Sequence, residues 1–241
     1  MTEKITGIVL NVRKYNDKNS IVTLFTRSRG RLSFISPVGS GKASKARRAR
    51  LMPLSVIATD LNFRSGVELQ RLGSVSLDEV WKDIYFNNEK RALTIFMADF
   101  LNRLLMASMP EENLYDFIVD SIRNLDNMES GISDFHIPFL VSMLAYAGIK
   151  PDVSGYEQGK VFDFNSGSFL YPEEAGVMTL PVDDSKHVMF VTRLNFSNIK
   201  RLRLTNAGRR QILYGLLNYY SFHFPGISSI KAPEVLREIF S

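Results

Sequence analysis

The basic side chains between Arg27 and Arg50 are the residues whose types and spacing most clearly suggest a chemistry. This stretch carries eight Lys or Arg residues and no carboxylate, and the nearest acids are Asp17 and Asp60. Clustered cations neutralise the phosphates of a polyanion without reading its sequence. The eight residues, which we predict to contact a nucleic acid, are Arg27, Arg29, Arg31, Lys42, Lys45, Arg47, Arg48 and Arg50.

The surroundings of this stretch allow two interpretations. Its second half, residues 39–50, has the composition of a Gly/Ser-rich loop that turns into a basic helix. Phe25 and Phe34 flank the first half, and aromatic rings beside cations are typical of surfaces on which bases stack. We therefore predict that both rings contact nucleic acid, while a place in the core fits them equally. The alternative for the cations is a solvated loop with no partner.

A second group of cations lies late in the chain, across the ends of two expected helices. It is a candidate for a further contact with DNA or with a partner protein. The alternative is that these charges complement the partial negative charge of a helix C-terminus near Arg203. The members of the group are Lys200, Arg201, Arg203, Arg209 and Arg210.

Sequence patterns typical of catalysis or metal binding are missing. The chain has no cysteine, which excludes disulfides, thiolate metal sites and a cysteine nucleophile. Its three histidines are far apart and lack the spacing of metal ligands. Gly41-Lys42 lacks the second glycine and the hydroxyl of a phosphate-binding loop, and no Gly-x-Ser-x-Gly motif occurs. We therefore predict no catalytic residue, no metal and no cofactor, and we do not expect an enzyme.

The net charge of +5 is unevenly distributed along the 241 residues. Residues 1–80 hold 14 basic and 6 acidic side chains, residues 81–135 hold 5 and 10, and residues 136–241 hold 11 and 9. The surface that faces a polyanion is therefore expected mainly in the first third of the chain. No apolar run approaches the roughly 20 residues of a membrane-spanning helix, and the N-terminus does not have the pattern of a secretion signal. We expect a cytoplasmic protein without a membrane contact.

The first 78 residues alternate with a period of two, which is typical of strands. Five short strands with one long connection between the third and the fourth favour an antiparallel barrel of the OB type over a sandwich, which usually needs about seven strands. We therefore predict an OB-fold domain over residues 1–78. The expected strands are Glu3–Tyr15, Ser20–Thr26, Arg31–Val38, Leu54–Asn62 and Val67–Val75.

After Ser76 the hydrophobic period changes from two to 3.6, which predicts an all-helical domain over residues 79–241 and an α+β chain as a whole. A small hairpin near residues 150–181 is expected to interrupt the helices, because β-rich runs flank Asn165-Ser166-Gly167. The expected helices are Glu89–Met109, Glu111–Met128, Asp134–Ala147, Asp183–Leu194, Ser197–Leu204, Asn206–His223 with Asn206 as its cap, and Pro233–Phe240.

Short motifs follow one another in a characteristic order. The early ones are Thr6-Gly7-Ile8-Val9-Leu10, Tyr15, Ser20–Thr26 and Gly30, followed by the basic loop and Pro53. The later ones are Leu114–Ile118, Phe135–Leu140, Tyr219–His223 and the closing Ser229–Leu236. In their order and spacing these motifs resemble the RecO family of bacterial recombination mediators, and the resemblance spans essentially the whole chain.

The resemblance implies a protein that binds single- and double-stranded DNA through its barrel and basic face and anneals complementary strands. It implies cooperation with RecR and RecF in loading RecA onto gaps coated by the single-stranded-DNA-binding protein (SSB), and hence an association with the nucleoid. It also implies that the acidic, apolar-ended C-terminal tail of SSB contacts the helical domain. Many relatives hold a four-cysteine zinc site after the third helix. This chain has Phe162, Asp163, Phe164 and Phe169 there, so apolar packing is expected instead of zinc.

The residues alone leave two other functions open. An RNA-binding barrel protein, such as a ribosome-associated factor, would use the same basic surface. An enzyme acting on nucleic acid would need a carboxylate cluster that holds a metal in the groove. Of the 6 acids in residues 1–80, Glu3, Asp78 and Glu79 lie at the ends of the predicted barrel, which does not favour such a cluster.

Overall fold

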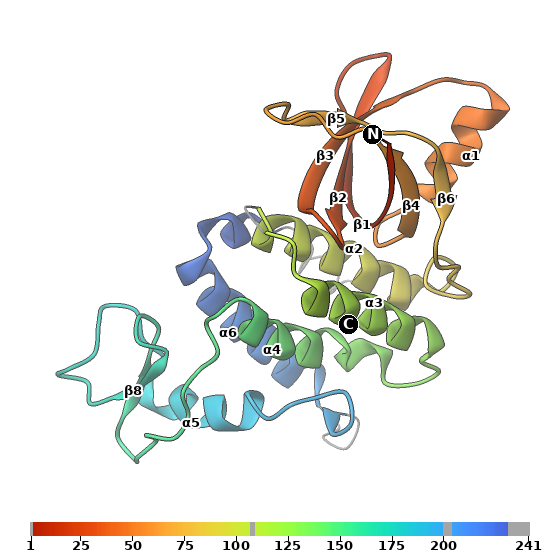
Figure 1. Cartoon of the computed structure of the whole chain (residues 1–241). Coiled ribbons are helices and arrows are strands. Elements are labelled where there is room, and N and C mark those ends of the chain that lie inside the picture. The colour runs from red at the N-terminus through yellow and green to blue at the C-terminus, as the bar shows by residue number, and fades with distance from the viewer. Residues whose placement is uncertain (1, 107–108, 200–203, 231–241) are drawn as a thin grey trace. The chain divides into compact units, whose positions relative to one another are not determined.

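The computed structural model of the chain describes residues 2–106, 109–199 and 204–230 (Figure 1). These residues form two compact units, residues 2–129 and residues 130–230. The first unit holds a curled mixed β-sheet with three helices, and the second is mainly helical with a small hairpin. The predicted α+β class, with an N-terminal β domain followed by a helical region with a small hairpin, is confirmed. The β domain is a curled mixed sheet of six strands where five antiparallel strands were predicted.

The sheet of the first unit has six strands in the order β5-β3-β2-β1-β4-β6. The three long strands at its centre form the predicted antiparallel meander, with Val9 opposite Leu24 and Leu24 opposite Leu32. The strands are β1 (Glu3–Lys14), β2 (Asn19–Thr26), β3 (Gly30–Pro37), β4 (Val56–Leu61), β5 (Leu69–Arg71) and β6 (Val75–Leu77).

The fifth predicted strand is divided in two by a bend, and this bend makes the sheet curl. Its first part, β5, pairs in parallel with β3, and its second part, β6, pairs antiparallel with β4. The two edges of the sheet are therefore two halves of one segment. Gly73 lies in the bend, where a Cβ atom would be 2.4 Å from the carbonyl oxygen of Asp60. Only glycine allows this close approach, so the one parallel pairing depends on a residue that interrupts the strand pattern.

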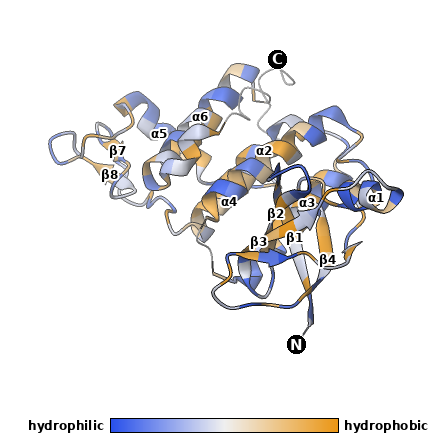
Figure 2. Ribbon diagram, turned by 90° about the horizontal axis from the view of Figure 1, so that it is seen from above, coloured by the Kyte–Doolittle hydropathy of each residue, from blue (hydrophilic) through white to orange (hydrophobic). Residues whose placement is uncertain are grey.

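The interior of the curled sheet is apolar. Val9, Val22 and Leu24 are fully buried, and Leu72 enters the same cluster from the bend. In Figure 2, hydrophobic colour runs along β1, β2 and β4, whereas helix α1 (Lys42–Arg50) is mostly hydrophilic. The sheet is thus held by its own core, and α1 contributes no buried side chain to it.

Helices α2 (Asn88–Leu104) and α3 (Glu112–Asn127) confirm two of the predicted helices, although α2 ends earlier than expected. Asn87 caps α2 by accepting hydrogen bonds from the amides of Glu89 and Lys90. Both helices belong to the same compact unit as the sheet. The sheet itself ends at Leu77, next to the predicted domain boundary after residue 78.

A buried lysine fixes the segment between the sheet and α2. Lys90 is 2% exposed, and its Nζ donates to the carbonyl oxygen of Asp126 at 2.8 Å and pairs with the carboxylate of Asp83 at 2.7 Å. The Asp126 carboxylate accepts the amides of residues 82–84. Burial alone would raise the pKa of Asp126, but these amide hydrogen bonds outweigh it and hold the pKa below its ordinary value.

The second unit begins with a 3-10 turn, η1 (Ile132–Asp134), and helix α4 (His136–Tyr146). The predicted hairpin is present as β7 (Val161–Asp163) and β8 (Ser168–Leu170), with Gly167 at a φ of 64° in its turn. Helix α5 (Val182–Val191), helix α6 (Asn206–His223) and the 3-10 turn η3 (Pro225–Ser229) follow. Thr205 caps α6 through its hydroxyl, so the prediction of Asn206 as the cap was wrong by one residue.

Aromatic rings hold the hairpin in the second unit. Phe162 packs edge-on against Phe169 with ring centroids 5.4 Å apart, and Phe164 meets Tyr219 of α6 at 5.3 Å. Tyr220 adds a hydrogen bond of 2.7 Å from its hydroxyl to the carbonyl oxygen of Leu140 in α4. The apolar packing expected for this segment is confirmed.

Some predicted elements cannot be compared with the structure. The predicted helix Pro233–Phe240 lies outside the described residues, as does the part of Ser197–Leu204 over residues 200–203. Among the helices that are described, none is long and apolar enough to cross a membrane.

Candidate nucleic-acid interface

Helix α1 provides the basic surface predicted from the sequence. It lies in the connection between β3 and β4, and apart from Ser44 its sequence KASKARRAR consists of the good helix formers Ala, Lys and Arg. Arg47, Arg48 and Arg50 occupy its last turn, where cations complement the helix dipole. Because none of its residues is buried, α1 needs something other than apolar packing to hold it against the sheet.

Two arginines supply this attachment. Arg47 donates from Nη2 to the carbonyl oxygen of Gly73 at 3.1 Å, and Arg50 donates from Nη1 to that of Val75 at 2.9 Å. Residues three apart lie on the same face of a helix, so this face points to the bent edge of the sheet. Leu51, 7% exposed, follows the helix into the core. We assign Arg47 and Arg50 to the positioning of α1.

The opposite face of α1 presents its other cations to solvent. Lys42, Lys45 and Arg48 are exposed, and among the described residues none of them has an acidic partner. Lys45 and Arg48 are three residues apart and so lie next to each other on the helix surface. A positively charged side chain that is free of internal pairing can displace the counterions of a phosphate backbone. These three are therefore the strongest candidates for phosphate contacts.

The three arginines before the loop are engaged within the first unit. Arg27 pairs with Asp116 at 2.7 Å and with Glu112 at 3.3 Å, and the hydrogen bond to Glu112 is the largest cause that raises the pKa of Arg27. Arg29 pairs with Glu3 at 2.6 Å. The eight predicted cations therefore do not form one free run.

Arg31 is the third of these engaged arginines. It donates from Nη1 to the carbonyl oxygen of Asn102 in α2 at 2.5 Å, and burial lowers its pKa. Its guanidinium thus stabilises the packing of α2 on the sheet. With Arg27, Arg29 and Arg31 engaged in this way, the remaining candidates for a nucleic-acid contact among the eight predicted cations are those of α1.

Phe25 and Phe34 require a correction. Both rings are fully buried, and Phe25 packs against Tyr115 of α3 with centroids 6.2 Å apart. A ring without exposed surface cannot stack on a base, so the predicted stacking role was wrong. Both belong to the core instead.

The second predicted cluster is only partly described. Lys200, Arg201 and Arg203 lie outside the described residues. Arg209 is 9% exposed and donates from Nε to the buried carboxylate of Asp134 at 2.7 Å, so it stabilises the second unit and is not available to DNA. Arg210, the next residue, is exposed.

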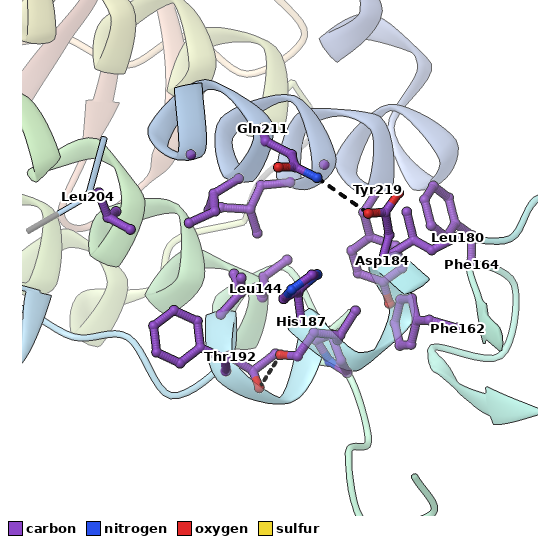
Figure 3. Close-up of a pocket in the computed structure, with 18 residues that line it drawn as sticks. Leu144, Phe162, Phe164, Leu180, Asp184, His187, Thr192, Leu204, Gln211 and Tyr219 are labelled. Carbon is purple, nitrogen blue, oxygen red and sulfur yellow. Dashed lines mark hydrogen bonds between the residues drawn. The ribbon is translucent and has the colours of Figure 1, made fainter. Parts of the chain in front are cut away.

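The second unit contains an apolar cavity that sequence reasoning missed. It has a volume of about 330 Å³ and lies between the hairpin, α5 and α6 (Figure 3). Phe162, Leu144 and Leu216 contribute apolar walls, and Gln211 donates to Asp184 at 3.3 Å on its border. The lining residues come from segments up to 75 residues apart in the chain, and no local pattern in the sequence reveals them.

Comparison with known proteins gives one consistent result. The family model described as "Recombination protein O N terminal" matches residues 1–80, and "Recombination protein O C terminal" matches residues 88–228. The chain is 32% identical to the DNA repair protein RecO of Porphyromonas gingivalis strain W83 over 97% of each chain. It is 27% identical to the protein of the same name from Phocaeicola vulgatus, and 28% identical to that from Flavobacterium psychrophilum, each over the full length of both chains.

Proposed function

Because the chain belongs to the recombination protein O (RecO) family, we propose that it is a DNA-binding recombination mediator and not an enzyme. It binds single- and double-stranded DNA, anneals complementary strands and helps to load RecA onto DNA coated by SSB. The observation that carries this proposal is the exposed face of α1, on which Lys42, Lys45 and Arg48 have no acidic partner among the described residues. Because its proposed ligand is DNA, the protein is proposed to act at the nucleoid in the cytoplasm.

The mechanism follows from charge. Two complementary strands repel each other through their phosphates until base pairs form, and cations held between them lower this repulsion. The arginines that attach α1 to the sheet hold its outer cations at a fixed place, so their charge is concentrated on one surface. Because phosphates are the same in every sequence, such a surface promotes annealing without reading bases.

The proposed protein partners are RecR, with RecF and RecA acting through it, and the C-terminal tail of SSB. We assign the apolar end of this tail to the cavity of the second unit, whose walls include Phe162, Phe190 and Leu216. Lys186 and Arg193 are exposed and adjoin the lining residues His187 and Thr192 in the chain, and their charge favours an acidic peptide, whereas the Asp184 carboxylate on the border accepts a hydrogen bond from Gln211. An apolar anchor in a pocket with charges on its rim is a common way of holding a peptide.

Charge reversal on α1 tests the proposal. The variant Lys45→Glu with Arg48→Glu should bind single-stranded DNA more weakly and anneal complementary oligonucleotides more slowly, each by on the order of tenfold or more at low salt. Electrophoretic mobility and a fluorescence annealing assay measure both effects. An unchanged annealing rate would overturn the proposal. Competition with a matched RNA strand is the second readout, because preferential displacement by RNA would favour an RNA-binding protein.

A matched control separates a local effect from a change in net charge. Lys82 and Arg91 are exposed and lie outside α1, before and at the start of α2. The variant Lys82→Glu with Arg91→Glu changes the net charge by the same amount. It should retain DNA binding and annealing close to those of the parent protein, because neither residue belongs to the exposed face of α1.

A further inference from the structure

The turn between β1 and β2 is held in one conformation by its own hydrogen bonds. The amides of Tyr15 and Asn16 donate to the carbonyl oxygen of Asn19 at 3.0 and 3.1 Å. The side-chain oxygen of Asn16 accepts the amide of Lys18 at 2.9 Å, which closes an Asx turn. The position of Tyr15 at the start of this turn is therefore fixed by the backbone.

The ring of Tyr15 is the free aromatic surface of the curled sheet. It is 57% exposed and, within the part of the chain that the structure describes, it has no ring, cation or hydrogen-bond partner. Phe63, the exposed ring between β4 and β5, differs because the guanidinium of Arg29 lies 4.4 Å from its centroid and covers one face. A ring with an open face is what base stacking requires.

Two unpaired cations flank Tyr15 in the chain. Arg13 and Lys18 are exposed and lack an acidic partner among the described residues, whereas Lys14 pairs with Asp17 at 2.7 Å. The carbonyl oxygen of Lys18 accepts the amide of Val38 at 2.7 Å, so the turn lies beside the segment that leads into α1. An open aromatic ring with unpaired cations on both sides of it in the chain combines the two elements of a single-strand site.

We propose that Tyr15 stacks on an unpaired nucleobase while Arg13 and Lys18 contact the flanking phosphates. This inference rests on the proposed DNA-binding function and deepens it, because it names a contact that only unpaired DNA can make. A base inside a duplex is already stacked on both sides and cannot reach the ring. The turn thus distinguishes single strands from duplexes, whereas the cations of α1 bind both.

The most exposed aromatic residue of the first unit, Phe86, does not share this role and provides a matched control. Phe86 is 79% exposed. It lies between β6 and α2, outside the turn between β1 and β2, so a base contact that depends on this turn does not involve it.

The test compares an oligo-dT strand with an abasic deoxyribose-phosphate strand of the same length, which keeps the phosphates and lacks the bases. Tyr15→Ala should weaken binding of oligo-dT by about 5- to 150-fold, the range for one stacked base. It should leave binding of the abasic strand and of duplex DNA within about twofold, because both rely on phosphate contacts. Tyr15→Phe should restore oligo-dT binding, and Phe86→Ala should not change it.

The outcomes separate this inference from the proposed function. Equal losses on oligo-dT and the abasic strand, or no loss on either, would overturn the stacking role of Tyr15. If the Tyr15 variant binds like the parent while Lys45→Glu with Arg48→Glu binds weakly, the proposed function stands and only the inference fails. If the parent protein binds no DNA, both fail.

Discussion

Removal of the outward-facing cations of α1 should change the salt dependence of DNA binding by a calculable amount. The variant carries Lys42→Ala, Lys45→Ala and Arg48→Ala, and all three parent residues are exposed without an acidic partner among those described. It keeps the hydrogen bonds of Arg47 and Arg50 to the sheet. Alanine is the best helix former, so α1 should remain folded.

The magnitude follows from counterion release. Each phosphate contact adds about 0.7 to the slope of log K against log salt for single strands and about 0.9 for duplexes. Three lost contacts should therefore reduce the slope by about 2 on single strands and almost 3 on duplex DNA. When salt is raised from about 50 to 200 mM, the factor by which single-strand affinity falls should be roughly 20 times smaller for the variant than for the parent.

Fluorescence anisotropy of a labelled oligonucleotide at several salt concentrations measures this slope. The control variant carries Lys82→Ala, Arg91→Ala and Lys150→Ala, three exposed positions that change the net charge equally. Its slope should equal that of the parent. The same reduction in both variants would show that net charge alone is responsible, and no reduction in the α1 variant would refute the assignment of its cations to phosphate contacts.

The two anchoring arginines should behave differently. Arg47→Met with Arg50→Met removes the hydrogen bonds to Gly73 and Val75, so the amides of α1 should exchange faster with deuterium than in the parent. Exchange that stays as slow as in the parent would contradict the positioning role.

Three further predictions concern stability and the cavity. Burial lowers the pKa of His136 to about 3, so below pH 6.5 the unfolded chain binds more protons than the folded one. The free energy of unfolding should therefore fall by up to about 1.4 kcal/mol for each unit by which the pH is lowered from 6 to 4. Urea titrations should show a smaller fall for His136→Gln. Lys90→Met leaves Asp83 and the Asp126 carbonyl without their cation, and urea unfolding should show a loss of about 3 kcal/mol. Gly215→Leu should fill the cavity, because a Cβ there meets no atom within 4 Å. Calorimetry should then detect weaker binding of an SSB tail peptide and unchanged DNA binding. An undiminished peptide affinity would show that the tail binds at a surface other than this cavity.

The sequence predicted the strands, the hairpin and the basic helix because each depends on local patterns. It failed on which side chains face inward, and β2 illustrates the reason. Residues 21–26 of this strand are all buried, since one face meets the interior of the curled sheet and Phe25 on the other meets Tyr115 of α3. Alternation cannot separate a core face from a surface face when both are covered.

Long-range pairing explains the remaining errors at the candidate site. Arg27 pairs with Glu112 and Asp116 of α3, which lie 85 and 89 residues later in the chain. Arg209 pairs with Asp134, which is 75 residues away in the chain. An acid-free stretch of sequence can therefore be neutralised by acids that the fold brings to it. Of the eight predicted cations, Lys42, Lys45 and Arg48 of α1 have no acidic partner among the described residues, and their contact with phosphates stays a prediction.

The bend at Gly73 also bears on whether copies of the protein that are crowded together would associate through their sheets. Strands at the edge of a sheet can recruit a strand from another molecule, and crowding raises this risk. Here both edge strands are three residues long and belong to one bent segment, and Arg47 and Arg50 occupy the carbonyls of Gly73 and Val75. The helix that we propose as the DNA-binding surface therefore also covers backbone carbonyls at the edge of the sheet, where strands of neighbouring molecules could otherwise pair.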